Sequence, residues 1–416
     1  MVETKFTNTE LGLLPEDWNV RGIRGLLCLL TDFDANGSFD DMANNVSTSD
    51  GSGFAWYVRA TDLEQGTTLD KVKYVDKKSY NFLKKTALFG GEVLIAKRGD
   101  IGKVYLFEMK TQYATLAPNL YLLKLNDEVN AGFLFYYLKS ALGQKKLKSI
   151  NASTSLGAIY KEDVKNLLLP FPQKSEQTRI AKALSDIDAL LVSLDKLISK
   201  KMAIKRGMMQ QLLTGQKRLH GFNKPWKRTK IGELGELQKG SIYPFLYPND
   251  DFVEYSMPAF DAGQTANICK GNTMSSARTT INGKVLLINK LNVRQKRIWL
   301  VNADSTNSVC SGEFLPFEST ECSLEYLRQL LLTDSIVKEW IENSTGTSNS
   351  QKRIRPSYML SYCLFIPSEL SEQIAIANIL DDMDAEITEL ESKKAKYTAI
   401  KQGMMQQLLT GKIRLI

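Results

Sequence analysis

The sequence has few of the residues from which metal and disulfide sites are built. A single histidine, His220, occurs in 416 residues, and the five cysteines (28, 269, 310, 322 and 363) form no CxxC pair. A structural zinc site needs four closely spaced Cys or His ligands, so we predict no metal ligands. An odd number of cysteines without motif spacing is typical of reduced thiols in the cytosol.

Long hydrophobic runs are also missing. Runs such as Leu26–Leu30 are short, whereas a membrane helix needs roughly 18–20 apolar residues. No N-terminal stretch combines a basic start with a long apolar segment, so export is not expected. We therefore expect a cytoplasmic protein without membrane contacts, from a bacterium or an archaeon.

Motifs for catalysis are absent as well. The chain has no G-x-x-x-x-G-K-[ST] phosphate loop and no Asn/Asp-Pro-Pro-aromatic loop for a flipped base, and base chemistry needs such a pocket. Asp100, Glu108 and Lys110 loosely resemble a magnesium nuclease pattern, D-x7-E-x-K. The other half of the chain lacks this pattern, so an exposed acidic turn is the better interpretation, and we predict no catalytic residues.

A positive charge is present in excess. The net charge is +8 with a pI near 9.0, which favours a polyanionic partner such as nucleic acid. With 416 residues the chain is long enough for two to four domains.

An internal repeat defines the architecture. Shifted by 196 positions, Ser175–Leu219 aligns without a gap on Ser371–Leu415 with 25 identities in 45 positions, including GMMQQLLTG. Both copies predict one long helix, because apolar residues recur at alternating steps of four and three, as in Ile180, Leu184 and Ile187. We expect the two helices to pair as an antiparallel coiled coil. Ser175 and Ser371 are the expected N-caps, and Gly215 and Gly411 the expected C′ residues.

A shared surface near the end of each helix is a candidate for partner binding. A glycine within a helix costs about 1 kcal/mol relative to alanine, so its repetition suggests the close approach of another backbone. The methionine pair that follows is adaptable and suits an interface, although filling of the chain's own core explains it equally well. The predicted partner-binding residues are Gly207, Met208, Met209, Gly403, Met404 and Met405.

Two diverged globular segments alternate with the helices. Each opens on a Pro-Trp turn, contains a glycine followed by an apolar strand, and ends in an apolar strand that stops at proline. We predict an α/β (α+β) protein with a pseudo-two-fold repeat, divided into a first recognition domain (1–172), a first long helix (173–217), a second recognition domain (218–368) and a second long helix (369–416).

These motifs together resemble one protein family, the specificity subunits of type I restriction-modification systems. The resemblance rests on P-x-x-W at the head, GEVLIAKRGDIGKV, LPFPQKSEQTRIAKALSDIDALL, IPSELSEQIAIANILDDMDAEI, and MMQQLLTG closing both helices. It covers essentially the whole chain. The second domain departs from it at one place, where INKLNVRQKR stands instead of AKRGDIGKV.

The resemblance implies a non-catalytic DNA-recognition subunit. Each globular segment is then a target-recognition domain that reads one half of a split target in double-stranded DNA, and the helices fix the distance between the halves. Two methyltransferase (modification) subunits and the restriction/translocase subunits are the implied partners. S-adenosylmethionine, ATP and Mg²⁺ would be bound by those partners, so no cofactor is expected on this chain.

Basic residues mixed with amide and hydroxyl residues on loops are the candidates for DNA contact, because phosphates attract Lys and Arg while base edges need donors and acceptors. Solvated surface charge is the alternative for each of them. The predicted DNA-binding residues are Lys97, Arg98, Lys103, Ser153 and Thr154 in the first domain, and Arg294, Gln295, Lys296, Arg297, Gln351, Lys352, Arg353 and Arg355 in the second. Two rival functions stay open, a DNA enzyme acting alone and a coiled-coil scaffold without a nucleic-acid role.

Overall fold

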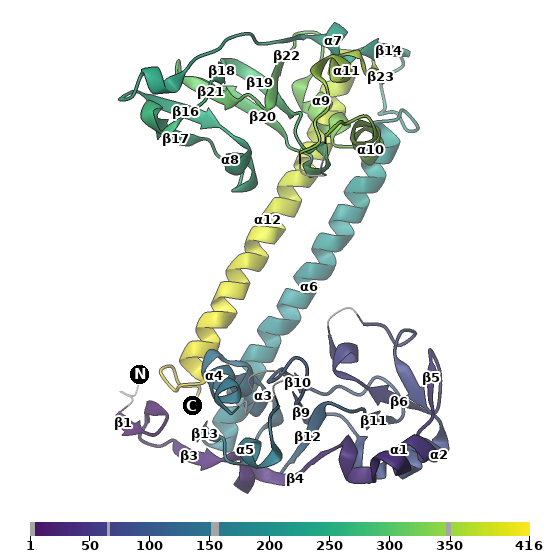
Figure 1. Ribbon diagram of the computed structural model, residues 1–416, viewed down its shortest axis with the longest axis vertical. Coiled ribbons are helices and arrows are strands. Elements are labelled where there is room, and N and C mark those ends of the chain that lie inside the picture. The colour runs from purple at the N-terminus through teal and green to yellow at the C-terminus, as the bar shows by residue number, and fades with distance from the viewer. Residues whose placement is uncertain (1–4, 65–66, 151–157, 347–350) are drawn as a thin grey trace. The chain divides into compact units, whose positions relative to one another are not determined.

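The computed structural model describes residues 5–64, 67–150, 158–346 and 351–416 (Figure 1). The chain divides into two compact units. The first unit contains residues 1–194 and 393–416, and the second contains 195–392. Each unit therefore combines one globular domain with a piece of both long helices. In the described part of the chain, no helix has the length and apolar character needed to cross a membrane.

The first domain is built on two main sheets that share a core. One has the strand order β10-β9-β12-β4 and the other β5-β7-β6-β11-β8, in which β6 and β11 are parallel. Two small antiparallel pairs, β1–β2 and β3–β13, lie beside them. The strands are β1 (Phe6–Thr9), β2 (Gly12–Pro15), β3 (Asn19–Gly22), β4 (Leu27–Asp32), β5 (Thr48–Asp50), β6 (Ala55–Val58), β7 (Lys73–Val75), β8 (Ala87–Leu88), β9 (Val93–Ala96), β10 (Val104–Leu106), β11 (Ala114–Leu116), β12 (Leu120–Leu125) and β13 (Leu168–Phe171).

Short helices cover these sheets. They are α1 (Phe39–Asn45), α2 (Lys77–Phe82), α3 (Ala131–Lys139), α4 (Ala141–Ser149) and α5 (Lys161–Lys165), with 3₁₀ turns that include η2 (Phe33–Asn36) and η4 (Lys84–Thr86). Phe133 and Leu134 of α3 are fully buried and join Ile180 and Leu184 of the long helix in one core cluster. The domain is thereby packed onto its own helix.

The second domain repeats this plan with different details. Its sheets have the orders β15-β22-β19-β20 and β17-β16-β21-β18, and β16 and β21 are parallel like β6 and β11. The strands are β14 (Trp226–Lys230), β15 (Glu236–Leu237), β16 (Asp251–Tyr255), β17 (Asn267–Lys270), β18 (Arg278–Thr280), β19 (Gly283–Asn289), β20 (Ile298–Ala303), β21 (Ser308–Ser311), β22 (Phe314–Glu318) and β23 (Cys363–Pro367). The helices are α7 (Ile231–Leu234), α8 (Met257–Asp261), α9 (Leu324–Leu331), α10 (Asp334–Glu342) and α11 (Pro356–Ser361).

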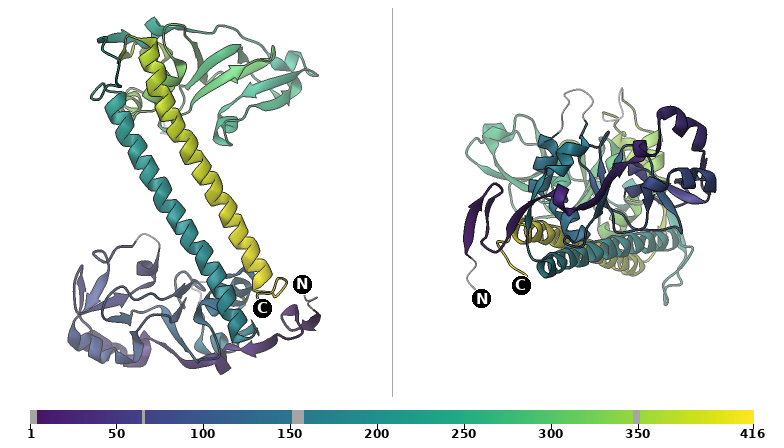
Figure 2. Two further views of the ribbon diagram at one scale, coloured as in Figure 1. Left: turned by 180° about the vertical axis from the view of Figure 1, so that it is seen from behind. Right: turned by 90° about the horizontal axis from the view of Figure 1, so that it is seen from below.

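The repeated segments form two long helices, α6 (Lys174–Leu212) and α12 (Leu370–Leu408). In the first unit the end of α12 lies beside the beginning of α6 (Figures 1 and 2), where Lys401 pairs with Asp188. In the second unit Lys205 pairs with Asp384 at 2.5 Å. In both pairs a late residue of one helix meets an early residue of the other, so the predicted antiparallel packing holds within each unit.

The predicted helix ends are partly right. Gly215 and Gly411 adopt left-handed conformations with φ of +73° and +69°, as expected for C′ residues. The predicted N-caps are wrong, because α6 begins at Lys174 and α12 at Leu370. Ser175 and Ser371 therefore lie inside the first turn.

A buried glutamate explains the Ser-Glu-Gln motif that begins each helix. Glu176, with 4% of its side chain exposed, accepts hydrogen bonds from Arg414 and from the Trp18 indole. Its counterpart Glu372 is fully buried and is held by Arg218, with Trp226 nearby. The glutamine beside each glutamate is buried too and ties the helix to its domain. The motif is thus the joint between domain and helix, and it occurs once in each unit.

The two ends of each domain meet at this joint. β3 pairs antiparallel with β13 in the first domain, and β14 pairs with β23 in the second. A strand near the start of each domain, β3 or β14, therefore leaves from the place where the domain's last strand leads into the long helix. In the first unit the C-terminal residues pack there too, since Arg414 also pairs with Asp17 at 2.6 Å.

Candidate nucleic-acid interface

The hairpin that the sequence analysis singled out is present in both domains. β9 pairs with β10, and β19 pairs with β20, so AKRGDIGKV and INKLNVRQKR form equivalent turns. The first turn uses Gly99 (φ +74°) and Gly102 (φ +80°) for its left-handed positions, whereas the second uses Asn292 and Lys296, both at φ +51°. A non-glycine residue in this region is uncommon, and asparagine tolerates it best. The missing glycines therefore change the turn's sequence without removing the turn.

A second loop of the same domain is fixed beside each hairpin. In the first domain the Ile159 amide donates to the Lys97 carbonyl at 3.3 Å. In the second domain the Asn292 amide donates to the Lys352 carbonyl at 2.8 Å, and Ile354 donates to Lys290 at 3.0 Å. The structure thus brings together the two predicted DNA-binding segments of the second domain, 294–297 and 351–355.

The charges on the first hairpin are largely neutralised within the chain. Lys97 is buried, with 9% of its side chain exposed, and its ammonium group lies 2.6 Å from Asp32 and 2.7 Å from Asp34. Lys103 pairs with Asp100 and Glu64. Arg98 is exposed, and no ion pair of its side chain occurs within the described ranges. Arg98 is therefore the cation of this turn that is available to a phosphate.

The second hairpin shows the same division. Lys296 pairs with Asp334 at 2.5 Å, Arg297 with Asp261 at 2.7 Å, and Arg353 with Glu313 at 2.8 Å. The remaining candidates make no such pair with any residue whose position is described. They are Arg294, Gln295, Gln351 and Arg355, which are exposed, and Lys352, which is half-buried. Ser153 and Thr154 of the first domain lie outside the described residues.

One buried carboxylate, Asp32, was missed by the sequence analysis. Asp32 receives hydrogen bonds from Lys97 and Lys161, both at 2.6 Å. Burial raises the pKa of this carboxyl, but the two lysines outweigh that effect and hold the pKa below its usual value. The cluster anchors the base of the first hairpin to β4. Since Asp32 and Lys97 are 65 residues apart, no local pattern marks their contact.

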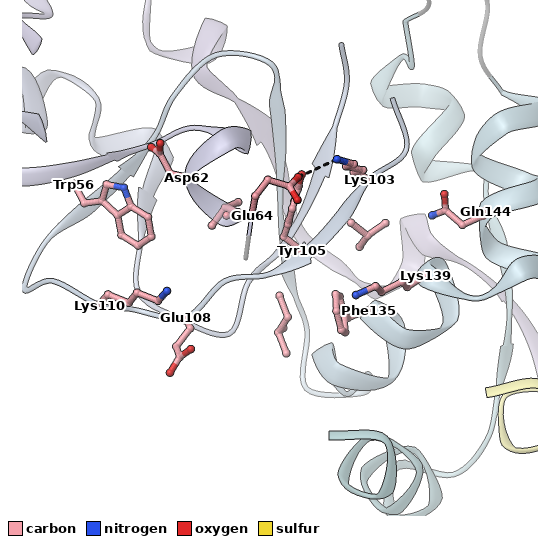
Figure 3. A pocket seen from close by; sticks show the side chains of 13 residues that line it. Trp56, Asp62, Glu64, Lys103, Tyr105, Glu108, Lys110, Phe135, Lys139 and Gln144 are labelled. Carbon is pink, nitrogen blue, oxygen red and sulfur yellow. Dashed lines mark hydrogen bonds and ion pairs between the residues drawn. The ribbon is translucent and has the colours of Figure 1, made fainter. Parts of the chain in front are cut away.

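A hollow of about 660 Å³ lies between β10 and α3 (Figure 3). Its lining mixes aromatic rings with charged groups, among them Trp56, Tyr105, Phe135, Lys103, Lys139, Glu64, Glu108 and Lys110. Burial, together with the nearby charge of Lys401, lowers the pKa of Lys139.

The nuclease-like trio is not gathered at this hollow. Asp100 bonds Lys103 at 2.7 Å on the hairpin, whereas Glu108 and Lys110 lie on the other side of the hollow (Figure 3). Over the described ranges, no three acidic, Cys or His side chains are placed to hold a metal ion. The interpretation of this segment as an exposed strand and turn agrees with its geometry.

The predicted partner-binding residues have two different environments. An added Cβ on Gly207 or Gly403 would meet nothing within 4 Å, so neither glycine serves a close approach within the chain. The methionines that follow pack partly into the chain's own cores, Met208 and Met209 in the second unit, and Met404 and Met405 in the first. Part of their role is thus core filling, the alternative that the sequence left open.

Exposed apolar residues accompany these glycines. Ile204 and Ile400 occupy equivalent positions one turn before Gly207 and Gly403, and they are 44% and 40% exposed. On a helix, residues three or four apart lie on one face. Each unit therefore presents the same small surface of isoleucine and glycine.

Comparisons with known proteins give a consistent result. Residues 15–203 and 223–401 each match the family described as "Type I restriction modification DNA specificity domain". Two relatives come from Methanocaldococcus jannaschii. The MjaX type I restriction enzyme specificity subunit is 30% identical over 239 residues, which cover 56% of this chain and 53% of that protein. The MjaVIII specificity subunit is 25% identical over 361 residues, covering 78% of this chain and 76% of that protein. The alignment thus spans about half the length of the first of these relatives.

Solved structures agree on the fold. The S subunit of a type I restriction-modification system from M. genitalium has a TM-score of 0.61 at 16% identity, covering 94% of this chain and 96% of that one. A chain from a study of complex assembly in the type I R-M system has a TM-score of 0.53 at 15% identity, covering 96% and 99%.

Proposed function

Since this chain belongs to the family of type I restriction-modification specificity subunits and carries two of its DNA specificity domains, we propose that it reads a split target in double-stranded DNA, one half with each domain. The observation that carries this proposal is the pair of equivalent hairpins. Each turn lies against a second loop of its domain, and each presents an exposed arginine, Arg98 or Arg294, among neighbours that are already ion-paired.

The repeated helices support a role in assembly. Two methyltransferase subunits would dock on them, because the isoleucine–glycine surface occurs once in each unit with the same residues. Restriction/translocase subunits would join that core, and α6 and α12 would set the spacing between the two half-sites. The chain is the recognition component of the complex, and S-adenosylmethionine, ATP and Mg²⁺ would be bound by its partners. The location would be the cytoplasm, where the DNA is.

Arg294 offers the sharpest test of the reading surface. Its removal breaks no ion pair described in this structure, so Arg294→Gln should leave folding unchanged. A contact to a base is worth about 1–3 kcal/mol of discrimination, whereas a lost phosphate contact weakens all sequences alike and lowers the salt slope by about one. Arg228→Gln, which removes another exposed arginine, from β14, is the matched control.

The measurement combines binding with methylation mapping. The complex of this chain with its modification subunits is titrated with target DNA over a salt series, and the methylomes of cells carrying each variant are sequenced. We expect a two-part motif for the wild type, and for Arg294→Gln a weaker or relaxed second half. If the wild-type complex binds DNA without salt dependence, or methylates one unsplit motif, the proposal is wrong.

A further inference from the structure

A lysine-rich surface on the first domain lies outside the predicted recognition loops. Residues 77–86, which form α2 and η4, contain four lysines and no acidic residue. Lys77, Lys78, Lys84 and Lys85 are all exposed, and none of them makes an ion pair with a described residue. α2 lies on the side of the domain that faces away from the long helices of its unit (Figure 1).

The segment has a fixed position. Asp76 caps α2 by accepting from the Ser79 amide at 2.7 Å, and Tyr80 packs on Phe54 and Tyr113, with ring centroids 5.6 and 5.4 Å away. The Leu83 side chain is completely buried. Four ammonium groups are thus held on a structured surface, which suits an extended anion better than a mobile tail would.

This surface adjoins the first recognition hairpin through η2. The Lys85 ammonium group donates to the Ala35 carbonyl at 3.0 Å, and Asn36 donates to the Thr86 hydroxyl at 2.9 Å. Asp34, which precedes Ala35 in η2, accepts a hydrogen bond from the Lys97 ammonium group at the base of the hairpin. η2 therefore connects the hairpin that carries the exposed Arg98 with the exposed lysines of η4 and α2 on the surface of the domain.

Within the described part of the second domain, the equivalent segment has no such lysine cluster. The segment between β7 and β8, which holds α2 and η4, corresponds to the segment between β17 and β18, since β6–β11 and β16–β21 are equivalent parallel pairs. Residues 271–277 of that segment, GNTMSSA, carry no charge. A general need for surface charge does not explain a lysine cluster on one domain alone.

We propose that Lys77, Lys78, Lys84 and Lys85 bind the phosphate backbone of duplex DNA flanking the half-site that the first domain reads. The inference rests on the proposed function and extends it to sequence-independent contacts on one side of the target. The ligand is DNA because successive phosphates present a line of negative charge that ammonium groups neutralise without reading bases.

Lys84→Gln/Lys85→Gln is the test variant, and Lys227→Gln/Arg228→Gln is the control. The control removes two adjacent exposed cations from β14 and leaves the same net charge. The full complex is titrated over a salt series with two duplexes that contain the target. One extends beyond the first half-site and the other ends there.

The expected result is specific to the long duplex. Loss of two phosphate contacts lowers the salt slope by about 1.8, so the wild type should lose about tenfold more affinity than the variant between roughly 50 and 200 mM salt. On the short duplex the variant and the wild type should bind alike, and the methylated sequence should not change. Equal slopes on the long duplex, an equal effect of the control, or an equal loss on the short duplex would each overturn the inference. A wild-type complex that binds neither duplex would refute the proposed function as well, which is a distinct outcome.

Discussion

Replacing Arg414 by alanine should destabilise the first unit by about 3 kcal/mol. The guanidinium group is 10% exposed and makes two 2.8 Å hydrogen bonds to Glu176, whose side chain is 4% exposed. Its pairing with Asp17 counts for less, because Asp17 is 55% exposed and exposed pairs are worth about 0–1 kcal/mol.

The magnitude follows from the charge that would be left behind. Removing one partner of a buried ion pair costs about 3–5 kcal/mol. We expect the lower end of this range, because the Trp18 indole still donates to Glu176 at 3.1 Å. For a unit of this size, about 3 kcal/mol lowers the melting temperature by roughly 6–12 °C.

Urea unfolding and amide hydrogen exchange would measure this effect, and exchange should rise in the first turn of α6. Asp17→Ala is the control and should cost less than about 1 kcal/mol. Arg414→Leu/Glu176→Leu should recover most of the loss, since replacing a buried pair by apolar residues is often neutral. If Arg414→Ala costs no more than Asp17→Ala, the reasoning from burial fails. If the double variant is as unstable as the single one, packing of the C-terminal residues matters more than charge.

Two further predictions concern the helix surface and the buried carboxylate. Gly207→Ala and Gly403→Ala should each raise the free energy of unfolding by up to about 1 kcal/mol, because the added Cβ meets nothing. Both should weaken co-purification of the methyltransferase subunit, and unchanged co-purification would remove these glycines from the docking surface. Asp32 has a lowered pKa in the folded chain, so its stabilising effect is present above about pH 3.9, its unfolded value, and is lost as the pH falls through the folded value. Asp32→Asn should flatten this acid limb of the stability curve measured by urea unfolding, and an unaltered limb would show that other carboxyls cause it.

The sequence was sufficient to predict the two long helices and their repetition. Periodic apolar residues such as Ile180 and Leu184 predict a long helix, because an α-helix places residues that recur at a period near 3.5 on one face. Both residues are fully buried as expected. The duplication also indicates the antiparallel pairing, since Asp188, Lys205 and their copies keep opposite charges at positions that meet when the helices run antiparallel.

The reading surface was less predictable. Lys97 and Arg98 are neighbours with the same charge, yet one is buried against Asp32 and the other is exposed. Which of these two cations pairs with a carboxylate depends on strands that come together only in the folded domain. The N-cap predictions at Ser175 and Ser371 were wrong for a different reason, because helix ends commonly shift by one or two residues.

The joint at Glu176 and Glu372 has a consequence for inheritance. The two glutamates of the joint are held by residues at the edges of a domain or in the repeated segments, such as Trp18 and Arg414. The neighbouring glutamines contact the interior of the domain through backbone amides, those of Asn130 and Ser323, which any side chain at these positions would leave in place. A gene fragment that carries the interior of one domain therefore encodes an exchangeable cassette, whose ends meet at β3–β13 or β14–β23. Recombination between genes that share the repeats would give the host a new specificity in one step, while the parts that hold the assembly together pass on unchanged.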